Sequence, residues 1–194
     1  MIAIIDYDAG NVKSVQNALK KLGFEAVITS DIETIKNADK VIFPGVGEAS
    51  SAMKKLQERG LDAVIPNLKQ PVLGICLGMQ LMCNASEEGN TKALGIFDCE
   101  VKLFPNSDIV PHMGWNNVSE MKGKLLENIS ETDNFYFVHS YYAEVGESTT
   151  SVCDYITPFS ATLEKDNFYA AQFHPEKSGD AGFKLLENFL NLRF

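Results

Sequence analysis

Short apolar runs alternate with amphipathic stretches through the first half of the chain. The apolar runs predict strands at residues 2–5, 24–29, 40–43 and 71–75. Helical apolar spacing or a helix-start pattern predicts helices at 12–22, from 31 onward, at 49–59 and from 76 to about 85. Because strands this apolar are usually buried on both faces, the alternation indicates a parallel sheet with helices on either side.

The pattern changes after residue 93, where short β-rich segments follow one another with little helix between them. Strands are predicted at 100–104, 135–138, 143–145, 151–155, 160–164 and 168–173, and a closing helix at 183–194. These segments predict an antiparallel extension or edge of the parallel sheet. With no repeat and no Pro/Gly/Ser-rich linker, we expect residues 1–194 to form a single α/β domain, a three-layer flavodoxin-like sandwich.

Charge and composition narrow the classes of function. The chain carries 17 Lys and Arg against 26 Asp and Glu, a formal net charge of −9, which argues against a nucleic-acid-binding protein. No apolar run approaches the ~20 residues that span a membrane. The first six residues read as a strand and not as a signal peptide, so we expect a cytoplasmic protein without membrane contact. Four cysteines and three histidines show no metal-ligand spacing, so neither a metal nor another cofactor is expected.

The segment Gly-Ile-Cys-Leu-Gly places Cys76 between an apolar strand and an amphipathic helix. This is the thiol form of the nucleophile elbow, a strained turn that lifts a reactive side chain clear of the backbone. Gly74 and Gly78 would let neighbouring backbone pass close by. The following helix would favour the thiolate through its positive end, and the first free amide, that of Leu77, would face a developing oxyanion. The alternative is a buried core cysteine.

A thiol nucleophile needs a base, and the base needs an orienting partner. His174 and Glu176 stand together in the sequence Gln-Phe-His-Pro-Glu. They can serve Cys76 only if the strands that precede them share one edge of the sheet. A histidine at a strand end satisfied by a local carboxylate is the alternative.

A third segment, Pro-Gly-Val-Gly, follows the strand at 40–43. It exposes backbone amides at the carboxyl end of a strand, where open α/β sheets bind their ligands. The amide of Val46 or Gly47 would be a second oxyanion donor beside Leu77. Because glycines flank Val46, its peptide can reorient, and we expect that donation there can be switched. The alternative is a plain tight turn.

In chain order the motifs are Pro-Gly-Val-Gly, then Gly-Ile-Cys-Leu-Gly-Met-Gln, then Gln-Phe-His-Pro-Glu-Lys-Ser. In this order they resemble the triad-type (class I) glutamine amidotransferases. The segments Pro-His-Met-Gly-Trp-Asn at 111–116 and Phe-Tyr-Phe-Val-His-Ser-Tyr-Tyr at 135–142 are similar to those of the glutaminase subunits of imidazole glycerol phosphate synthases. The resemblance implies hydrolysis of L-glutamine to glutamate and ammonia through a thioester on Cys76. It also implies a heterodimer with a (β/α)8-barrel cyclase, which uses the ammonia in histidine biosynthesis to make imidazole glycerol phosphate and aminoimidazole carboxamide ribonucleotide.

The same resemblance implies further site residues. Those that would bind glutamine are Gly45, Gly47, Gln80, Glu88, Ser140 and Tyr141, and those that would contact the cyclase are Asn11, Trp115 and Lys177. His112 and His139 have no carboxylate nearby in sequence, and we give them no role in proton transfer. Three alternatives stay open: a glutaminase subunit of the anthranilate or aminodeoxychorismate type, a stand-alone thiol hydrolase, and a non-catalytic binding module.

Overall fold

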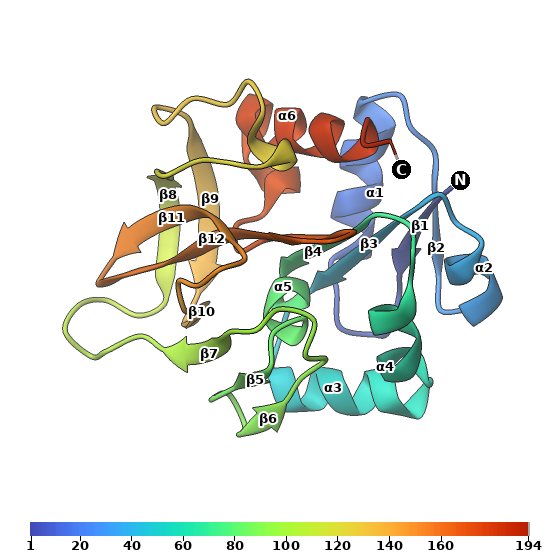
Figure 1. The fold of residues 1–194 in the computed structure, drawn as a ribbon, viewed down its shortest axis with the longest axis horizontal. Coiled ribbons are helices and arrows are strands. Elements are labelled where there is room, and N and C mark those ends of the chain that lie inside the picture. The colour runs from blue at the N-terminus through green and yellow to red at the C-terminus, as the bar shows by residue number, and fades with distance from the viewer. Residues whose placement is uncertain (194) are drawn as a thin grey trace.

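A seven-stranded sheet forms the centre of the computed structural model, which describes residues 1–193 (Figure 1). Its strand order is β11-β12-β13-β4-β3-β1-β2. The five parallel strands are β1 (Ile2–Ile5), β2 (Ala26–Thr29), β3 (Lys40–Gly45), β4 (Val72–Cys76) and β13 (Phe168–Ala171). β11 (Thr149–Tyr155) and β12 (Thr157–Lys165) are antiparallel and extend one edge.

Helices cover both faces of this sheet. They are α1 (Val12–Lys21), α2 (Ile32–Lys36), α3 (Ala49–Glu58), α4 (Leu61–Val64), α5 (Leu77–Leu81) and α6 (Gly179–Leu190), with 3-10 turns η1 (Ile65–Asn67), η2 (Lys124–Leu126) and η3 (Pro175–Lys177). Figure 1 shows α1 and α6 on one face and α3, α4 and α5 on the other. The predicted three-layer α/β sandwich with a mostly parallel central sheet is confirmed.

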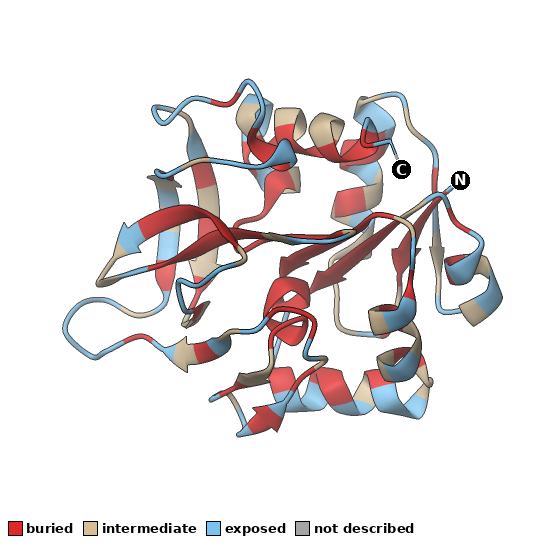
Figure 2. Cartoon of the chain, viewed as in Figure 1, coloured by how far each residue is buried: buried red, intermediate tan, exposed pale blue. Residues whose placement is uncertain are grey.

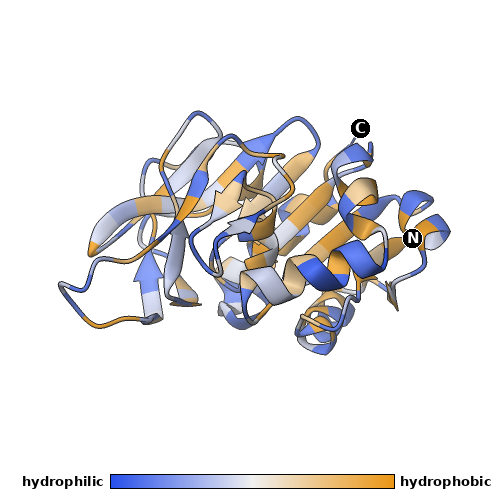
Figure 3. Cartoon of the chain, turned by 90° about the horizontal axis from the view of Figure 1, so that it is seen from below, coloured by the Kyte–Doolittle hydropathy of each residue, from blue (hydrophilic) through white to orange (hydrophobic). Residues whose placement is uncertain are grey.

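Two apolar cores lie on opposite faces of the sheet. Along β1, Ile2 and Ile4 belong to the core under α1 and α6, whereas Ala3 and Ile5 belong to the core over α3. This alternation follows from the two-residue period of a strand. It also explains why β1 and β4 are apolar at every position, and Figures 2 and 3 show the middle of the sheet as a buried, hydrophobic centre between half-polar helices. Each large apolar side chain buried here contributes roughly 1.5–3 kcal/mol.

Two smaller sheets lie beside the antiparallel edge. One has the order β10-β7-β5-β6 and comprises β10 (Tyr141–Ala143), β7 (Glu100–Leu103), β5 (Ala85–Ser86) and β6 (Thr91–Lys92). The other pairs β8 (His112–Asn117) with β9 (Asn134–His139) in antiparallel register. The β-rich second half is therefore confirmed, but it is divided among three sheets.

Several predicted boundaries are wrong. The helix after Cys76 ends at Leu81, not near residue 85, because Ala85 and Ser86 pair with β6 and β7 and draw the chain out of the helix. The strand expected at 143–145 lies at Tyr141–Ala143, and β8 was not predicted. β13 is parallel to β4, not part of the antiparallel extension. The closing helix spans Gly179–Leu190, so it begins before residue 183 and ends before residue 194, which itself lies outside the described residues.

Membrane-spanning helices are absent from residues 1–193, since none of the helices there combines enough length with enough apolar character to cross a bilayer.

Candidate active site

Cys76 occupies a strained turn at the carboxyl end of β4. Its φ of 54° is positive, although it carries a side chain, and α5 begins at the next residue. A Cβ on Gly78 would overlap the backbone carbonyl of Phe43, and a Cβ on Gly74 would meet the Met82 sulfur. The turn therefore has the geometry of a nucleophile elbow, and both flanking glycines are needed for its close packing.

His174 and Glu176 reach the same edge of the sheet from the neighbouring strand. β13 runs parallel to β4, so the residues that follow each strand meet at one edge. His174 Nδ1 lies 2.8 Å from Glu176 Oε1, and their side chains are only 2% and 1% exposed. The hydroxyl of Ser178 donates to the His174 carbonyl at 2.6 Å and holds the turn. The carboxylate thereby fixes the ring with Nδ1–H toward Glu176 and Nε2 toward the pocket.

The imidazole of His174 is held in its charged form. Burial opposes the charge, but the interactions with Cys76 and Glu176 outweigh it and raise the pKa of His174 to about 10. Within residues 1–193, His174 Nε2 is buried and makes no hydrogen bond. Sulfur and imidazolium thus face one pocket, with the proton on Nε2 available to a leaving group.

Most of the residues assigned from the sequence line one pocket of about 370 Å³. Those that line it are Val46, Gly47, Cys76, Leu77, Gln80, Glu88, Ser140, Tyr141 and His174. Gly45 lies behind the wall, buried in β3 opposite Cys76. Glu176 also lies behind the wall and reaches the pocket only through His174.

The loop after β3 does not direct the Val46 amide into the pocket. Val46 N–H donates to the Ala9 carbonyl at 2.8 Å, while its side chain is 41% exposed. Gly47 has a φ of 109°, which favours glycine. Leu77 is the first residue of α5, so its N–H has no acceptor within that helix. Of the two amides expected as the second oxyanion donor, Val46 and Gly47, that of Val46 is bound to Ala9 in this conformation, and its peptide would have to turn before it could face a ligand.

Gln80 is fixed by two hydrogen bonds. Its Nε2 donates to the Tyr141 carbonyl and to Gln172 Oε1, each at 2.9 Å. The Tyr141 carbonyl also accepts from His139 Nδ1 at 2.7 Å. With both Nε2 hydrogens used, Gln80 presents Oε1 as the group available to a ligand.

Glu88 forms the polar end of the pocket. One of its oxygens accepts from the Ala49 N–H at 3.0 Å, at the start of α3. Burial and the nearby charge of Glu48 raise the pKa of Glu88, against the opposing hydrogen bond from Ala49. A ligand ammonium placed here would neutralise the carboxylate. Ser140 adds a further polar wall, with its carbonyl accepting from Phe104 N–H at 3.1 Å.

His112 and His139 form a buried neutral pair. His112 Nδ1 lies 3.0 Å from His139 Nε2. Burial is the main cause that lowers the pKa of His112 to about 4 and that of His139 to about 3. Both rings are therefore uncharged at neutral pH.

The residues expected at a partner interface are at least partly exposed. Trp115 is 58% exposed on β8, where its ring packs edge-on against Tyr136, and Lys177 is exposed on η3. Asn11 precedes α1 and is half-buried. Met113, on the same face of β8 as Trp115, is 63% exposed. We call this exposed face of β8, formed by Met113 and Trp115, the exposed apolar patch.

Sequence reasoning missed four residues of the site. Pro111, Val138 and His139 line the pocket, and Gln172 donates from Nε2 to Cys76 Sγ at 3.7 Å. Gln172 could have been found as the one polar residue in the apolar segment before His174. The other three could not, because they enter the site through the unpredicted pairing of β8 with β9.

The sequence of the chain matches a known protein family and its members. Residues 3–192 match the family model described as glutamine amidotransferase class-I. The imidazole glycerol phosphate synthase subunit HisH of Bacteroides fragilis strain YCH46 is 60% identical, covering 98% of this chain and 99% of that protein. Subunit HisH of Vibrio parahaemolyticus serotype O3:K6 is 47% identical, covering 98% of each protein.

Solved structures agree at the level of fold. A crystal structure of a glutamine amidotransferase aligns with a TM-score of 0.75 at 20% identity, covering 98% of this chain and 97% of that one. PurLQS from Thermotoga maritima aligns with a TM-score of 0.73 at 16% identity, covering 98% and 97%. The relatives do not favour the other synthases or the stand-alone hydrolase considered from sequence. The chain belongs to the class I glutamine amidotransferases and, within them, to the family of HisH subunits of imidazole glycerol phosphate synthase.

Proposed function

We propose that this chain is the glutaminase subunit of an imidazole glycerol phosphate synthase, acting in the cytoplasm as one half of a heterodimer. The observation that carries the proposal is the arrangement of Cys76 in an elbow, with the buried His174–Glu176 pair on the adjacent parallel strand. The 60% identity to a HisH subunit over nearly the full length supports the choice of synthase.

The geometry supports hydrolysis of the glutamine side chain through a thioester. The Cys76 thiolate attacks the amide carbon, and the amide oxygen becomes an oxyanion beside the Leu77 N–H. His174 gives its Nε2 proton to the departing nitrogen, which leaves as ammonia, and Glu176 keeps the ring in place. His174 then takes a proton from water, whose oxygen attacks the thioester carbonyl. Breaking the carbon–sulfur bond releases glutamate and restores the thiolate.

Glutamine fits the polar groups around the pocket. Glu88 would bind the α-ammonium, and Gln80 Oε1 would accept a further N–H of the substrate. Backbone groups of Gly47, Ser140 and Tyr141 would complete the contacts. A pocket of about 370 Å³ is of the size that holds a small ligand.

A partner that covers the pocket is a chemical requirement of this function. Ammonia released into water at neutral pH becomes ammonium, which is not a nucleophile, so it must pass directly to an acceptor. The exposed apolar patch offers a docking surface next to the pocket, and an exposed Trp is typical of interfaces. We assign this surface, with Asn11 and Lys177, to a (β/α)8-barrel cyclase.

A glutaminase assay with and without the cyclase tests the proposal. The isolated chain should release glutamate slowly, because the Val46 amide is bound to Ala9. Adding the cyclase with its nucleotide ligand should raise turnover and couple glutamine to imidazole glycerol phosphate. Equal turnover in both conditions would remove the case for coupling. If the chain instead supported formation of anthranilate or aminodeoxychorismate with the subunit of another synthase, the assignment to a cyclase partner would be wrong.

A further inference from the structure

Gln172 is a buried amide in the mostly apolar segment that leads to His174. It follows β13, is 0% exposed, and its backbone N–H donates to the Ala161 carbonyl at 2.8 Å. Burial of an amide is unfavourable unless the amide finds hydrogen-bond partners, so its partners indicate what the position is for. Among residues 1–193, the side-chain hydrogen bonds of Gln172 go only to Gln80 and Cys76.

The orientation of the Gln172 amide follows from its neighbours. The Tyr141 carbonyl can only accept, so the side-chain atom of Gln80 that faces it must be the nitrogen. The same nitrogen faces Gln172, so the facing atom there must be the oxygen. Nε2 of Gln172 is thereby turned toward Cys76 Sγ, 3.7 Å away, as a hydrogen-bond donor.

The N–H of Gln172 matters because few other groups around the Cys76 sulfur would stabilise a negative charge on it. α5 has only five residues, so few peptide dipoles add up behind Cys76. The Val138 carbonyl, 4.0 Å from the sulfur, can accept from a neutral thiol but disfavours an anion. His174 supplies positive charge from one side, and Gln172 supplies an N–H from another. Hydrogen bonds to an ionised acceptor are about twice as strong as neutral ones.

We propose that Gln172 is a positioning residue of the glutaminase site, which holds the sulfur of Cys76 as a thiolate through Nε2 and Gln80 in its ligand-binding orientation through Oε1. The inference rests on the proposed function. It joins the nucleophile and a substrate contact through one buried amide. The two halves of the role use different atoms, so they can be separated by substitution.

Two variants separate them. Gln172→Glu keeps an oxygen that can accept from Gln80, but a carboxyl oxygen takes the place of the N–H that donates to Cys76. Gln172→Met fills a similar volume and removes both the bond to Gln80 and the bond to Cys76. The pH at which iodoacetamide alkylates Cys76 at half its maximal rate should rise by about one unit or more in both variants. Alkylation is read on the peptide that carries Cys76, by mass spectrometry. With cyclase present, KM for glutamine should rise only in Gln172→Met, while kcat falls in both.

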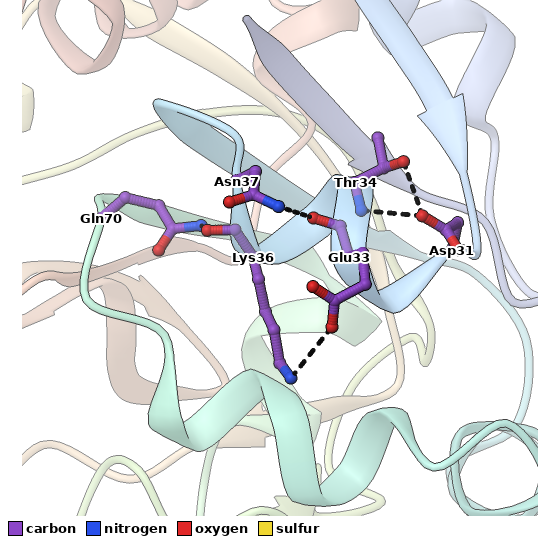
Figure 4. Close-up of polar contacts among 6 residues, drawn as sticks. All are labelled: Asp31, Glu33, Thr34, Lys36, Asn37 and Gln70. Atoms are coloured by element: carbon purple, nitrogen blue, oxygen red, sulfur yellow. Dashed lines mark hydrogen bonds and ion pairs between the residues drawn. The ribbon is translucent and has the colours of Figure 1, made fainter.

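Gln70 provides a matched control. Its Nε2 donates to the Ile35 carbonyl at 2.8 Å. It also donates, more weakly, to the Lys36 carbonyl, which Figure 4 shows beside it. It lies before β4, at the end opposite Cys76. Gln70→Met should lower the melting temperature without moving the alkylation midpoint or KM.

Two results would decide against Gln172 or against the larger proposal. An unchanged alkylation midpoint in folded Gln172→Glu and Gln172→Met proteins would overturn the positioning role. Alkylation needs no glutamine, so it tests Gln172 separately from the function. If the unsubstituted chain showed no glutaminase activity with the cyclase, but the Gln172 variants still shifted the alkylation midpoint, the role of Gln172 at the thiol would stand and the proposed function would be rejected.

Discussion

The two walls of the pocket differ in how far they are prepared for chemistry. One wall is built from β4, β13 and the turns that follow them, and there the Cys76, His174 and Glu176 side chains are buried and already oriented. The other wall includes the loop after β3 and Pro111, which directly precedes β8. There Val46 donates its amide to Ala9, and apolar side chains face solvent.

This difference follows from what holds each wall. The first is set by neighbouring parallel strands, whose backbone hydrogen bonds and packing leave little freedom. In the second, the loop after β3 is held through the bond from Val46 to Ala9, whose exchange needs only the rotation of a peptide beside glycines. Under the proposed function, the nucleophile and base would need no partner to take up their geometry, whereas the second oxyanion donor and the docking surface would await one.

The largest effect should come from the prepared wall. Cys76→Ser should lower glutamine-dependent synthesis by at least about 10³-fold, because a serine hydroxyl is not ionised by a neighbouring imidazolium. Synthesis from added ammonium salts by the complex should persist. Cys153→Ser is the control, since that buried cysteine lies on β11 and its pKa is raised by burial to about 12. Loss of both activities in Cys76→Ser would indicate a structural role instead.

On the second wall, Val46→Pro removes the backbone N–H that the partner is expected to recruit. Activity stimulated by the cyclase should fall by about 10²–10³-fold, the cost of one oxyanion donor. Activity of the isolated chain should change little, because the Val46 amide is bound to Ala9 there. Val46→Ala keeps the N–H and should remain near wild type. Full stimulation of Val46→Pro would show that another group holds the oxyanion.

The pH profile tests the prepared wall again. Glu176→Gln keeps an acceptor for His174 Nδ1 but removes the negative charge, so the pKa of His174, raised to about 10, must fall. The alkaline decline of activity should move down by about 1–3 pH units. The free energy of unfolding depends on pH through the same group. Because the pKa of His174 is higher in the folded chain, at about 10, than in the unfolded chain, at ~6.5, the charged ring stabilises the fold fully below pH ~6.5. This stabilisation is lost as pH rises toward about 10. Glu131→Gln, at an exposed acid, should move neither profile, and an unmoved decline in Glu176→Gln would contradict the assigned pair.

Trp115→Ala probes the docking surface directly. Truncating a Trp at the centre of an interface commonly weakens binding by about 30-fold. Titrating the cyclase against glutaminase activity should therefore show a higher half-saturating concentration with the same maximal rate. Leu103→Ala is the control, because Leu103 is 48% exposed on β7, outside the exposed apolar patch. Equal shifts in the two variants would reject the assigned surface.

The two walls also differ in how well sequence predicts them. Cys76, His174 and Glu176 lie in short motifs at strand ends, and the position of an apolar strand end is a local property. β8 was missed because its pattern is inverted: His112 is buried, while Met113 and Trp115 face solvent. Hydrophobic alternation assigns apolar side chains to the core, so it cannot identify a strand whose apolar side chains face solvent. The Val46 peptide depends on Ala9, which is distant in sequence, so no local pattern sets its orientation.

The smallest expected effect comes from Asp31→Ala, which should change the melting temperature of the chain without changing the geometry of either pocket wall. Asp31 caps α2, accepting from the Thr34 N–H at 2.8 Å and from the Thr34 hydroxyl at 2.7 Å (Figure 4). Asp31→Ala should lower the melting temperature by about 2–4 °C without changing kcat or stimulation by the cyclase. Glu33→Ala, which breaks only an exposed pair with Lys36, should lower it less. If Asp31→Ala reduced stimulation at full folding, the second wall would depend on the stability of the whole sheet and not on its own local contacts.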